Sequence, residues 1–281
     1  MPYCLVVGDP IAHSLSPVIH LAAYRELGLN WDFRCQRVRS GTLKAFLLAA
    51  ADSQLRGLAV TMPLKPEALQ TATFADGLAK VTGAVNTLVP AAGGDWTGFN
   101  TDVRGVVEAF RQGGAINSLS GGSGVIFGSG STAASALAAF TELGLTELTV
   151  ISRTTAQTGA AFQAAQRMGL SVRAVTWHQV EDVNRALRVA QLVMGTVPAP
   201  VQEALPLSQL QIISHAFFLD AAYAPWPTPL ASWAQRCGAQ VIPGWEMLLH
   251  QGVAQVKLFT GQEVNAEILR PALLRNLPNR H

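Results

Sequence analysis

Short apolar runs alternate with amphipathic segments along the first part of the chain. Runs with strand-like patterning lie at 3–10, 31–38, 55–63, 83–91 and 94–102. Segments with helical spacing lie at 16–29, 42–51, 65–73 and 103–114. The first of these helices is expected to have Ser16 as its N-cap and Pro17 in its first turn. This alternation indicates an α/β layer structure with a mostly parallel sheet.

A second β-α series follows a short polar, glycine-rich stretch at 117–124, where we expect a boundary. Strand-like runs begin at residue 124 and continue at 146–154, 171–177, 190–198, 213–223 and 239–244. Their spacing leaves room for helices between them, which is typical of a doubly wound, Rossmann-type sheet. Two amphipathic helices without a strand, 244–261 and 266–277, close the chain and must pack on a layer that is already built.

The length of 281 residues is more than one typical core accommodates, so we expect two α/β domains. The first comprises residues 1–102 together with the C-terminal helices 245–281, and it is expected to bind the substrate. The second comprises residues 103–244 and is expected to bind a dinucleotide. The C-terminal helices are expected to pack back on the first domain.

Composition narrows the function classes. The chain is 49% hydrophobic and 14% charged, with a formal net charge of +2 and no basic stripe, so we expect a small-molecule substrate rather than nucleic acid. No apolar window is long enough for a membrane span, and no leader precedes the first strand, so we expect a cytoplasmic protein. Monomer and homodimer both remain open.

The cysteines and histidines do not suggest a metal site or a disulfide. Cys4, Cys35 and Cys237 are widely spaced, and none has a cysteine or histidine at a metal-ligand spacing. Cys4 and Cys35 lie in strand-like runs and are expected to be small core residues. His13 lies in a turn and is expected to be structural.

The segment at 127–136 predicts a dinucleotide site. Gly128 and Gly130 stand where a strand turns into a helix, so the backbone can approach a pyrophosphate and the helix N-terminus can bind its charge. Ala133 supplies the small residue needed for close helix–sheet packing. The neighbouring Ser129, Ser131 and Thr132 are candidate cofactor contacts as well. The alternative is a tight turn in a sheet that binds no ligand.

The end of the next strand bears on which dinucleotide binds. An NAD-binding site tends to place an acidic residue about twenty residues after the glycines, whereas a 2′-phosphate requires cations and hydroxyls. This chain has Ser152, Arg153 and Thr154 there and no nearby acid, which favours NADP. A solvated cation at a strand end is the alternative for Arg153.

Polar residues also gather at the predicted strand ends of the first half. Because ligands of open α/β sheets bind beyond the carboxyl ends of the strands, these residues are expected to share one crevice. They are Ser14, Ser16, Thr61, Lys65, Asn86, Asn100 and Asp102. Taken singly, each has a structural alternative: Ser16 and Asp102 as helix caps, Asn86 and Asn100 in turns, and Lys65 as a solvated cation.

Seven motifs resemble the shikimate dehydrogenase family in order and approximate spacing, over nearly the whole chain. They read GDPIAHSLSP, GLAVTMPLK, GAVNT, GFNTD, GSGSTA with ISRT, DAAYAPWPTPL and GWEMLLHQ. The HSxSP, VTxPxK and NTD motifs are far more specific than the glycine turn. The resemblance implies NADP-dependent, reversible reduction of 3-dehydroshikimate to shikimate, a step toward the aromatic amino acids.

The same resemblance implies roles for individual residues. Lys65 and Asp102 match the catalytic pair of the family, and Ser14 and Ser16 match the serines that bind the substrate carboxylate. Ring hydroxyls are expected near Thr61, Asn86, Asn100 and Gln251, with Tyr223 near the carboxylate. Gly244 matches a glycine close to the nicotinamide, and Thr196, in the segment MGTVPAP, is a further cofactor candidate.

Several positions depart from the family pattern, chiefly around the cofactor. Ala59 and Ser152 stand where the family usually has asparagine, and Gln157 stands where a second cation is common. Two alternatives therefore stay open. One is a quinate/shikimate dehydrogenase with relaxed substrate or cofactor specificity, including use of NAD. The other is a non-catalytic binding protein on the same scaffold.

Overall fold

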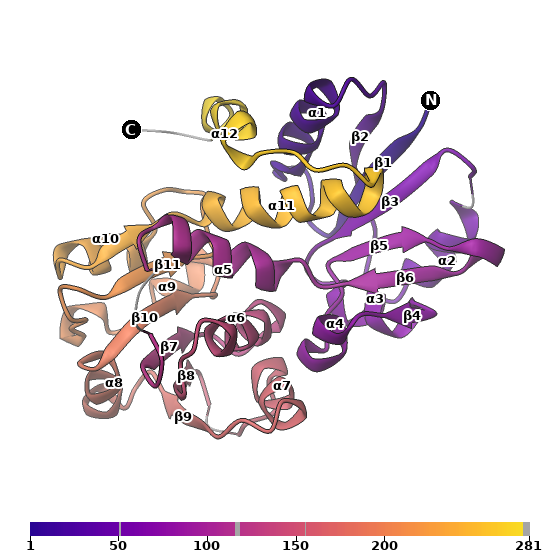
Figure 1. The fold of residues 1–281 in the computed structure, drawn as a ribbon. Coiled ribbons are helices and arrows are strands. Elements are labelled where there is room, and N and C mark those ends of the chain that lie inside the picture. The colour runs from indigo at the N-terminus through magenta and orange to yellow at the C-terminus, as the bar shows by residue number, and fades with distance from the viewer. Residues whose placement is uncertain (51, 116–118, 155, 278–281) are drawn as a thin grey trace. The chain divides into compact units, whose positions relative to one another are not determined.

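The computed structural model describes residues 1–50, 52–115, 119–154 and 156–277 (Figure 1). These residues form two units, Met1–Asp102 with Leu248–Leu277, and Val103–Met247. The start of the polar stretch predicted at 117–124 and the last residues of the predicted segment 245–281 lie outside the described residues.

A mixed sheet forms the centre of the first unit. Among the described residues its strand order is β2-β1-β3-β5-β6-β4. The strands are β1 (Tyr3–Gly8), β2 (Asp32–Arg37), β3 (Leu55–Val60), β4 (Phe74–Ala75), β5 (Thr87–Pro90) and β6 (Trp96–Phe99). β1 pairs in parallel with both β2 and β3, and β4 pairs in parallel with β6. β5 is antiparallel to both of its neighbours, β3 and β6.

Helices cover both faces of this sheet. They are α1 (Ser16–Glu26), α2 (Leu43–Ala49), α3 (Lys65–Thr71), α4 (Gly77–Thr82), α12 (Ala266–Arg275) and the part of α11 (Gly244–Thr260) from Leu248 onward; η1 (Ala92–Gly94) is a short 3₁₀ turn. The side chains of β1 alternate between the two faces. Leu5 and Val7 pack in a core with residues of α2, α3 and α4, whereas Cys4 and Val6 pack in a core with residues of α1 and α11.

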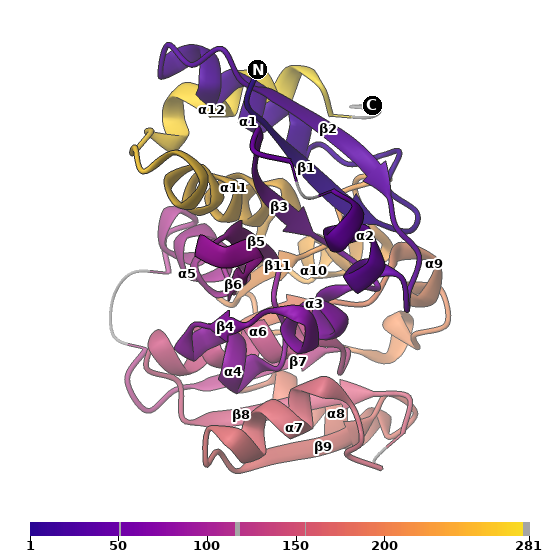
Figure 2. The same cartoon turned by 90° about the vertical axis from the view of Figure 1, so that its right-hand side faces the viewer.

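The C-terminal helices complete the first unit, as predicted. α12 lies beside α1 (Figures 1 and 2), and Phe259 of α11 belongs to the same core as Val6 and Ala59. Gly57 of β3 permits this approach, because a Cβ atom there would lie 2.3 Å from the Phe259 ring. Ala59, which departs from the family pattern, is buried in this core and faces α1 and α11.

The second unit is a parallel sheet with the strand order β12-β11-β10-β7-β8-β9 among the described residues. Its strands are β7 (Ser123–Phe127), β8 (Glu147–Ser152), β9 (Val172–Thr176), β10 (Ala190–Gly195), β11 (Phe217–Asp220) and β12 (Gln240–Ile242). Reading from β9, the chain runs third, second, first, fourth, fifth, sixth, which is the order of a Rossmann fold. The predicted fold class is confirmed.

Helices flank both faces of the second sheet as well. They are α5 (Asp102–Gln112), α6 (Ser131–Glu142), α7 (Ala160–Arg167), α8 (Val180–Leu187), α9 (Ala199–Gln202) and α10 (Pro229–Arg236), with a 3₁₀ turn, η2 (Leu207–Gln209). Val125 and Phe127 of β7 pack in a core with residues of α8 and α10. Gly124 lies on the other face, where a Cβ atom would be 2.5 Å from the ring of Phe140 in α6.

Two local predictions were wrong. Ser16 is not an N-cap but the first helical residue of α1, and its N–H donates to Ser14 Oγ at 3.3 Å. Asp102, for which a role as helix cap was the alternative, is the first residue of α5, and its carboxylate binds the side chains of Lys65 and Asn86. Cys35 is exposed, because β2 is an edge strand that buries only Phe33 among its side chains.

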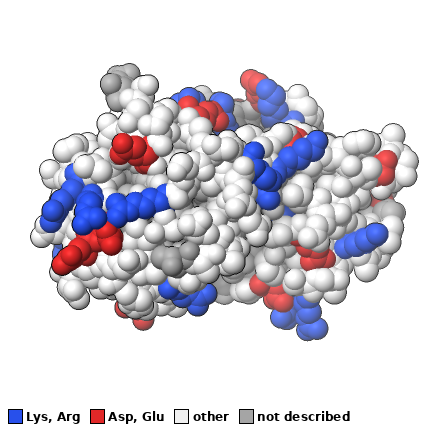
Figure 3. Space-filling model, turned by 90° about the horizontal axis from the view of Figure 1, so that it is seen from below, with Lys and Arg blue, Asp and Glu red and all other residues white. Residues whose placement is uncertain are grey.

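The charged residues form small groups of both signs on the face shown in Figure 3, with uncharged surface between them. Among the described residues, no helix has both the length and the apolar character needed to cross a membrane. The same residues contain no cluster of three or more histidine, cysteine, aspartate or glutamate side chains that could hold a metal ion.

Candidate active site

A buried ion pair joins two residues of the first unit, each of which is the first residue of a helix. Lys65 opens α3, directly after the loop that follows β3, and Asp102 opens α5 just after β6. Lys65 Nζ lies 2.5 Å from Asp102 Oδ2, and the two side chains are 13% and 6% exposed. Lys65 is thus not a solvated cation but one partner of a largely desolvated pair. Such a pair can hold and transfer a proton.

Asn86 binds the other oxygen of the same carboxylate. Its Nδ2 donates to Asp102 Oδ1 at 2.9 Å and to Thr101 Oγ1 at 2.8 Å. The same nitrogen lies 3.2 Å from Gln251 Oε1. The Thr101 N–H donates to Asn86 Oδ1 at 2.8 Å. The structure therefore joins Lys65, Asn86, Asp102 and Gln251 in one hydrogen-bonded network.

Other predicted residues of the first unit have local roles. The Asn100 side chain donates to Thr82 Oγ1 at 2.8 Å and to the Ala84 carbonyl at 3.0 Å, which ties β6 to the turn after α4. Thr61 is half-buried, and its methyl group would be 2.5 Å from a Cβ atom at Gly8. Ser14 is half-buried and Ser16 is buried at the start of α1. The substrate contacts expected of these residues stay predictions.

The glycine turn of the second unit has the backbone that a pyrophosphate site requires. Gly128 has a φ of 111°, and a Cβ atom there would lie 2.3 Å from Thr196 Oγ1. Thr196 in turn donates from Oγ1 to the Phe127 carbonyl at 2.7 Å. Gly130 differs, because a Cβ atom there would meet nothing within 4 Å, so it faces open space.

The helix that follows this turn is suited to an anion. α6 is 12 residues long and starts at Ser131, with Thr132 next and Ala133 fully buried against the sheet. Its first N–H groups lack intrahelical partners and bear the positive end of the helix dipole. The open side of Gly130 and this helix start fit a dinucleotide pyrophosphate. The contacts expected from Ser129, Ser131 and Thr132 stay predictions.

The end of β8 shows how the predicted 2′-phosphate residues are arranged. Ser152 is buried, and its hydroxyl donates to the Thr154 carbonyl at 2.6 Å, so it shapes the loop. Arg153 and Thr154 are exposed. The residues present fit a phosphate that is bound at the surface by one guanidinium and one hydroxyl.

Asp220, a fully buried carboxylate at the end of β11, was not among the predicted site residues. It accepts hydrogen bonds from Thr228 Oγ1 at 2.5 Å, Gln202 Nε2 at 3.0 Å and the Ala222 N–H at 3.0 Å. Burial raises the pKa of Asp220 to about 6, although these hydrogen bonds act in the opposite direction. The available signal was its place at the head of the motif DAAYAPWPTPL.

Asp220 precedes two residues that were predicted. Tyr223 is half-buried, three residues after Asp220. Gly244 opens α11, and a Cβ atom there would lie 2.3 Å from the Asp220 carbonyl oxygen and 2.7 Å from that of Ala221. Only glycine allows that approach. The roles of Tyr223, Gly244 and Thr196 toward ligands stay predictions.

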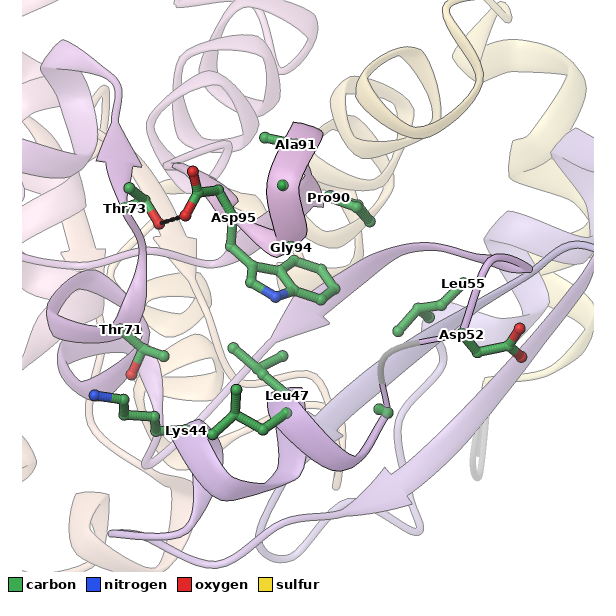
Figure 4. Close-up of a pocket in the computed structure, with 14 residues that line it drawn as sticks. Lys44, Leu47, Asp52, Leu55, Thr71, Thr73, Pro90, Ala91, Gly94 and Asp95 are labelled. Atoms are coloured by element: carbon green, nitrogen blue, oxygen red, sulfur yellow. Dashed lines mark hydrogen bonds between the residues drawn. The ribbon is translucent and has the colours of Figure 1, made fainter.

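A surface cavity of about 450 Å³ in the first unit contains none of the predicted site residues (Figure 4). Leu47 and Leu55 supply apolar walls, and Thr73 donates to Asp95 at its edge. Among the described residues that line it, none forms an acid–base pair comparable to Lys65 and Asp102. We therefore place the candidate active site at the Lys65 network and not in this cavity.

The chain is similar to known proteins over nearly its whole length. Residues 6–88 match the family model of the shikimate dehydrogenase substrate binding domain, and residues 244–274 match that of the shikimate 5′-dehydrogenase C-terminal domain. A shikimate dehydrogenase (NADP(+)) of Synechococcus is 35% identical over 97% of this chain and 94% of the relative. The crystal structure of Mycobacterium tuberculosis shikimate dehydrogenase, 34% identical, superposes with a TM-score of 0.86, covering 98% of this chain and 100% of that one.

A third relative is much longer than this chain. The pentafunctional AROM polypeptide of Lachancea thermotolerans is 33% identical over 91% of this chain, which spans only 17% of that polypeptide. The match to the Synechococcus and Mycobacterium tuberculosis proteins nevertheless extends over nearly their whole length, and it includes both units. The chain belongs to the shikimate dehydrogenase family.

Proposed function

We propose that this protein is an NADP-dependent oxidoreductase that catalyses the reversible reduction of 3-dehydroshikimate to shikimate. The observation that carries the proposal is the desolvated Lys65–Asp102 pair, with Asn86 and Gln251 in the same network. Family membership supports the substrate, and the names of two relatives, each a shikimate dehydrogenase (NADP(+)), support the cofactor. We assign substrate binding to the first unit and NADP binding to the second.

The chemistry is divided between the cofactor and the protein. NADPH, when bound, supplies a hydride to the carbonyl carbon of the substrate. The carbonyl oxygen then gains negative charge and needs a proton. Lys65 donates that proton from Nζ and stabilises the charge as it develops. In the reverse direction the same nitrogen accepts the hydroxyl proton.

Asp102 and Asn86 hold Lys65 ready for this step. The Asp102 carboxylate accepts a hydrogen bond from Nζ, which fixes the position of this group. Asn86 Nδ2 binds the second carboxylate oxygen, so the carboxylate cannot rotate freely. Gln251 presents its amide to the same space, where ring hydroxyls of the substrate would replace its bond to Asn86.

For the nucleotide, we assign the 2′-phosphate to Arg153 and Thr154, and the pyrophosphate to the turn at Gly128 and Gly130. One direct test compares the oxidation of shikimate and quinate with NADP and with NAD, monitored by absorbance of the reduced nicotinamide. We expect the highest kcat/KM with shikimate and NADP. A higher kcat/KM with quinate would favour the relaxed-specificity alternative. A higher kcat/KM with NAD would refute the proposal that Arg153 binds the 2′-phosphate of NADP.

A further inference from the structure

A second set of buried polar groups lies behind the catalytic pair, in the first unit. We propose that Thr87 and Gln255 are positioning residues for Lys65 and Asp102, acting through a one-way chain of hydrogen bonds that ends on the Asn86 side chain. This inference rests on the proposed function of the pair. Neither residue is expected to touch the substrate, so their effect must pass through Asn86.

The orientation of the Gln255 amide follows from its partners. Gln255 lies one helical turn after Gln251 on α11 and is 1% exposed. Its Nε2 donates to the backbone oxygen of Asn86 at 3.1 Å and to Thr87 Oγ1 at 3.0 Å. A carbonyl oxygen only accepts hydrogen bonds, so this end of the amide must be the NH₂ group. Gln255 Oε1 therefore faces the other way.

That oxygen faces His20, which lies on α1 and is fully buried. His20 Nε2 is 3.2 Å from Gln255 Oε1, and the imidazole stacks on Phe33 with ring centroids 4.0 Å apart. Because Oε1 only accepts, Nε2 must carry the ring proton. His20 Nδ1 has no hydrogen-bond partner among the described residues. Burial lowers the pKa of His20 to about 3, so the ring is neutral near pH 7.

The chain continues from Gln255 to the catalytic carboxylate. Thr87 Oγ1 accepts from Gln255, so its own proton is free to go to Asn86 Oδ1 at 2.9 Å. The Thr101 N–H, which only donates, also meets Asn86 Oδ1 and so identifies this atom as oxygen. Asn86 Nδ2 then points to Asp102 Oδ1. Each hydrogen bond in this series, from His20 to Asn86, therefore directs its proton toward Asp102.

This direction has a consequence for the Lys65–Asp102 pair. If the Asn86 amide turned over, its oxygen would face the Asp102 carboxylate, and two acceptors would meet without a proton between them. The Thr87 hydroxyl opposes that turn because it donates to Asn86 Oδ1. The hydroxyl therefore keeps the Asp102 carboxylate oriented for Lys65.

Paired substitutions at Thr87 separate the hydroxyl from the volume of the side chain. Thr87→Val keeps the shape and removes the hydroxyl, whereas Thr87→Ser keeps the hydroxyl and removes a methyl group. We expect Thr87→Val to lower kcat about tenfold, the effect of losing about one hydrogen bond. We expect KM for NADP to stay within about twofold, and Thr87→Ser to retain most of the wild-type kcat even where its melting temperature falls.

Gln255→Met tests the next link and should reproduce the kinetic change of Thr87→Val. Its matched control is Val256→Ala, the adjacent and fully buried residue of α11, which has no polar link to Asn86. We expect Val256→Ala to lower the melting temperature and leave kcat near the wild-type value. Equal kcat losses in Thr87→Ser and Thr87→Val, or in Val256→Ala and Gln255→Met, would show that packing alone is responsible.

A measurement on the unaltered protein makes the test independent of folding by the variants. Nitrogen-15 NMR of the histidine rings at neutral pH should show His20 protonated at Nε2 and bare at Nδ1. The opposite tautomer would overturn the hydrogen-bond chain. If the wild type did not oxidise shikimate, the proposed function would be at fault, and the tautomer of His20 would still decide whether the chain exists.

Discussion

At the residue scale, Asp220 is a buried carboxylate whose charge depends on the fold. Its folded-state pKa is raised to about 6 from the ordinary value of 3.8, because burial disfavours the charged form. The folded protein thus binds this proton more tightly than the unfolded chain does. The resulting stabilisation is fully present below pH 3.8 and is lost as the pH rises through 6. The loss of unfolding free energy over this pH range is on the order of 3 kcal/mol.

Asp220→Asn removes this ionisation and keeps the size of the side chain. We expect the free energy of unfolding of the variant, minus that of the wild type, to increase from pH 4 to pH 6.5. Urea titrations at a series of pH values measure it. Asp182→Asn is a suitable control, because Asp182 pairs with Arg173 and Arg185 near the surface. Parallel pH profiles for wild type and Asp220→Asn would contradict the assignment.

At the element scale, the turn between β7 and α6 contains two glycines with different requirements. Gly128 has a positive φ and no room for a Cβ atom beside Thr196. Gly130 has an ordinary φ of −81° and open space around its α-carbon. The first glycine is therefore needed by the fold. The second glycine is not required by the fold, so we expect that the ligand requires it.

Alanine substitutions distinguish these two requirements. Gly128→Ala should lower the melting temperature by several degrees, since it strains the backbone and displaces Thr196. Gly130→Ala should leave the melting temperature within about 2 °C and weaken NADP binding about tenfold or more, because its methyl group would occupy the space of the pyrophosphate. Calorimetry and fluorescence titration provide the two readouts. Unchanged NADP affinity in Gly130→Ala would place the pyrophosphate elsewhere.

Much of the element pattern could be predicted from the sequence, because buried strands and amphipathic helices have distinct apolar periods. The misses have physical causes. β4 has two residues and α4 six, too short for a period to be seen. Cys35 lies on an edge strand, where an alternating pattern does not require burial. Gln255 and Thr87 are 168 positions apart, so only the folded chain reveals their contact.

The candidate site was predictable to a similar degree. Lys65 and Asp102 stand at strand ends and belong to specific motifs, so their pairing was expected. The raised pKa of Asp220 depends on its burial, and the direction of the Thr87 hydrogen bonds depends on which partner can only donate or only accept. Neither property can be predicted from the local sequence, because both depend on residues that are distant along the chain.

At the scale of the whole molecule, cofactor binding should stabilise the folded chain. A ligand that binds only the native state at 100 times its dissociation constant adds about 2.7 kcal/mol. Arg153→Ala should weaken NADP about tenfold and reduce this stabilisation by about 1.4 kcal/mol. The stabilisation by NAD should stay unchanged, because NAD lacks the 2′-phosphate. Thermal shifts with both cofactors measure the difference, and equal losses would contradict a phosphate contact.

The most direct test of the proposed catalytic role of Lys65 is the turnover of shikimate with NADP by Lys65→Ala. We expect kcat to fall by about 100-fold or more, the range of a lost general acid–base group, with the KM for NADP little changed. Lys44→Ala, which removes an exposed lysine on α2, is the control and should keep wild-type kcat. Wild-type turnover by a folded Lys65→Ala would contradict the catalytic role of the buried pair.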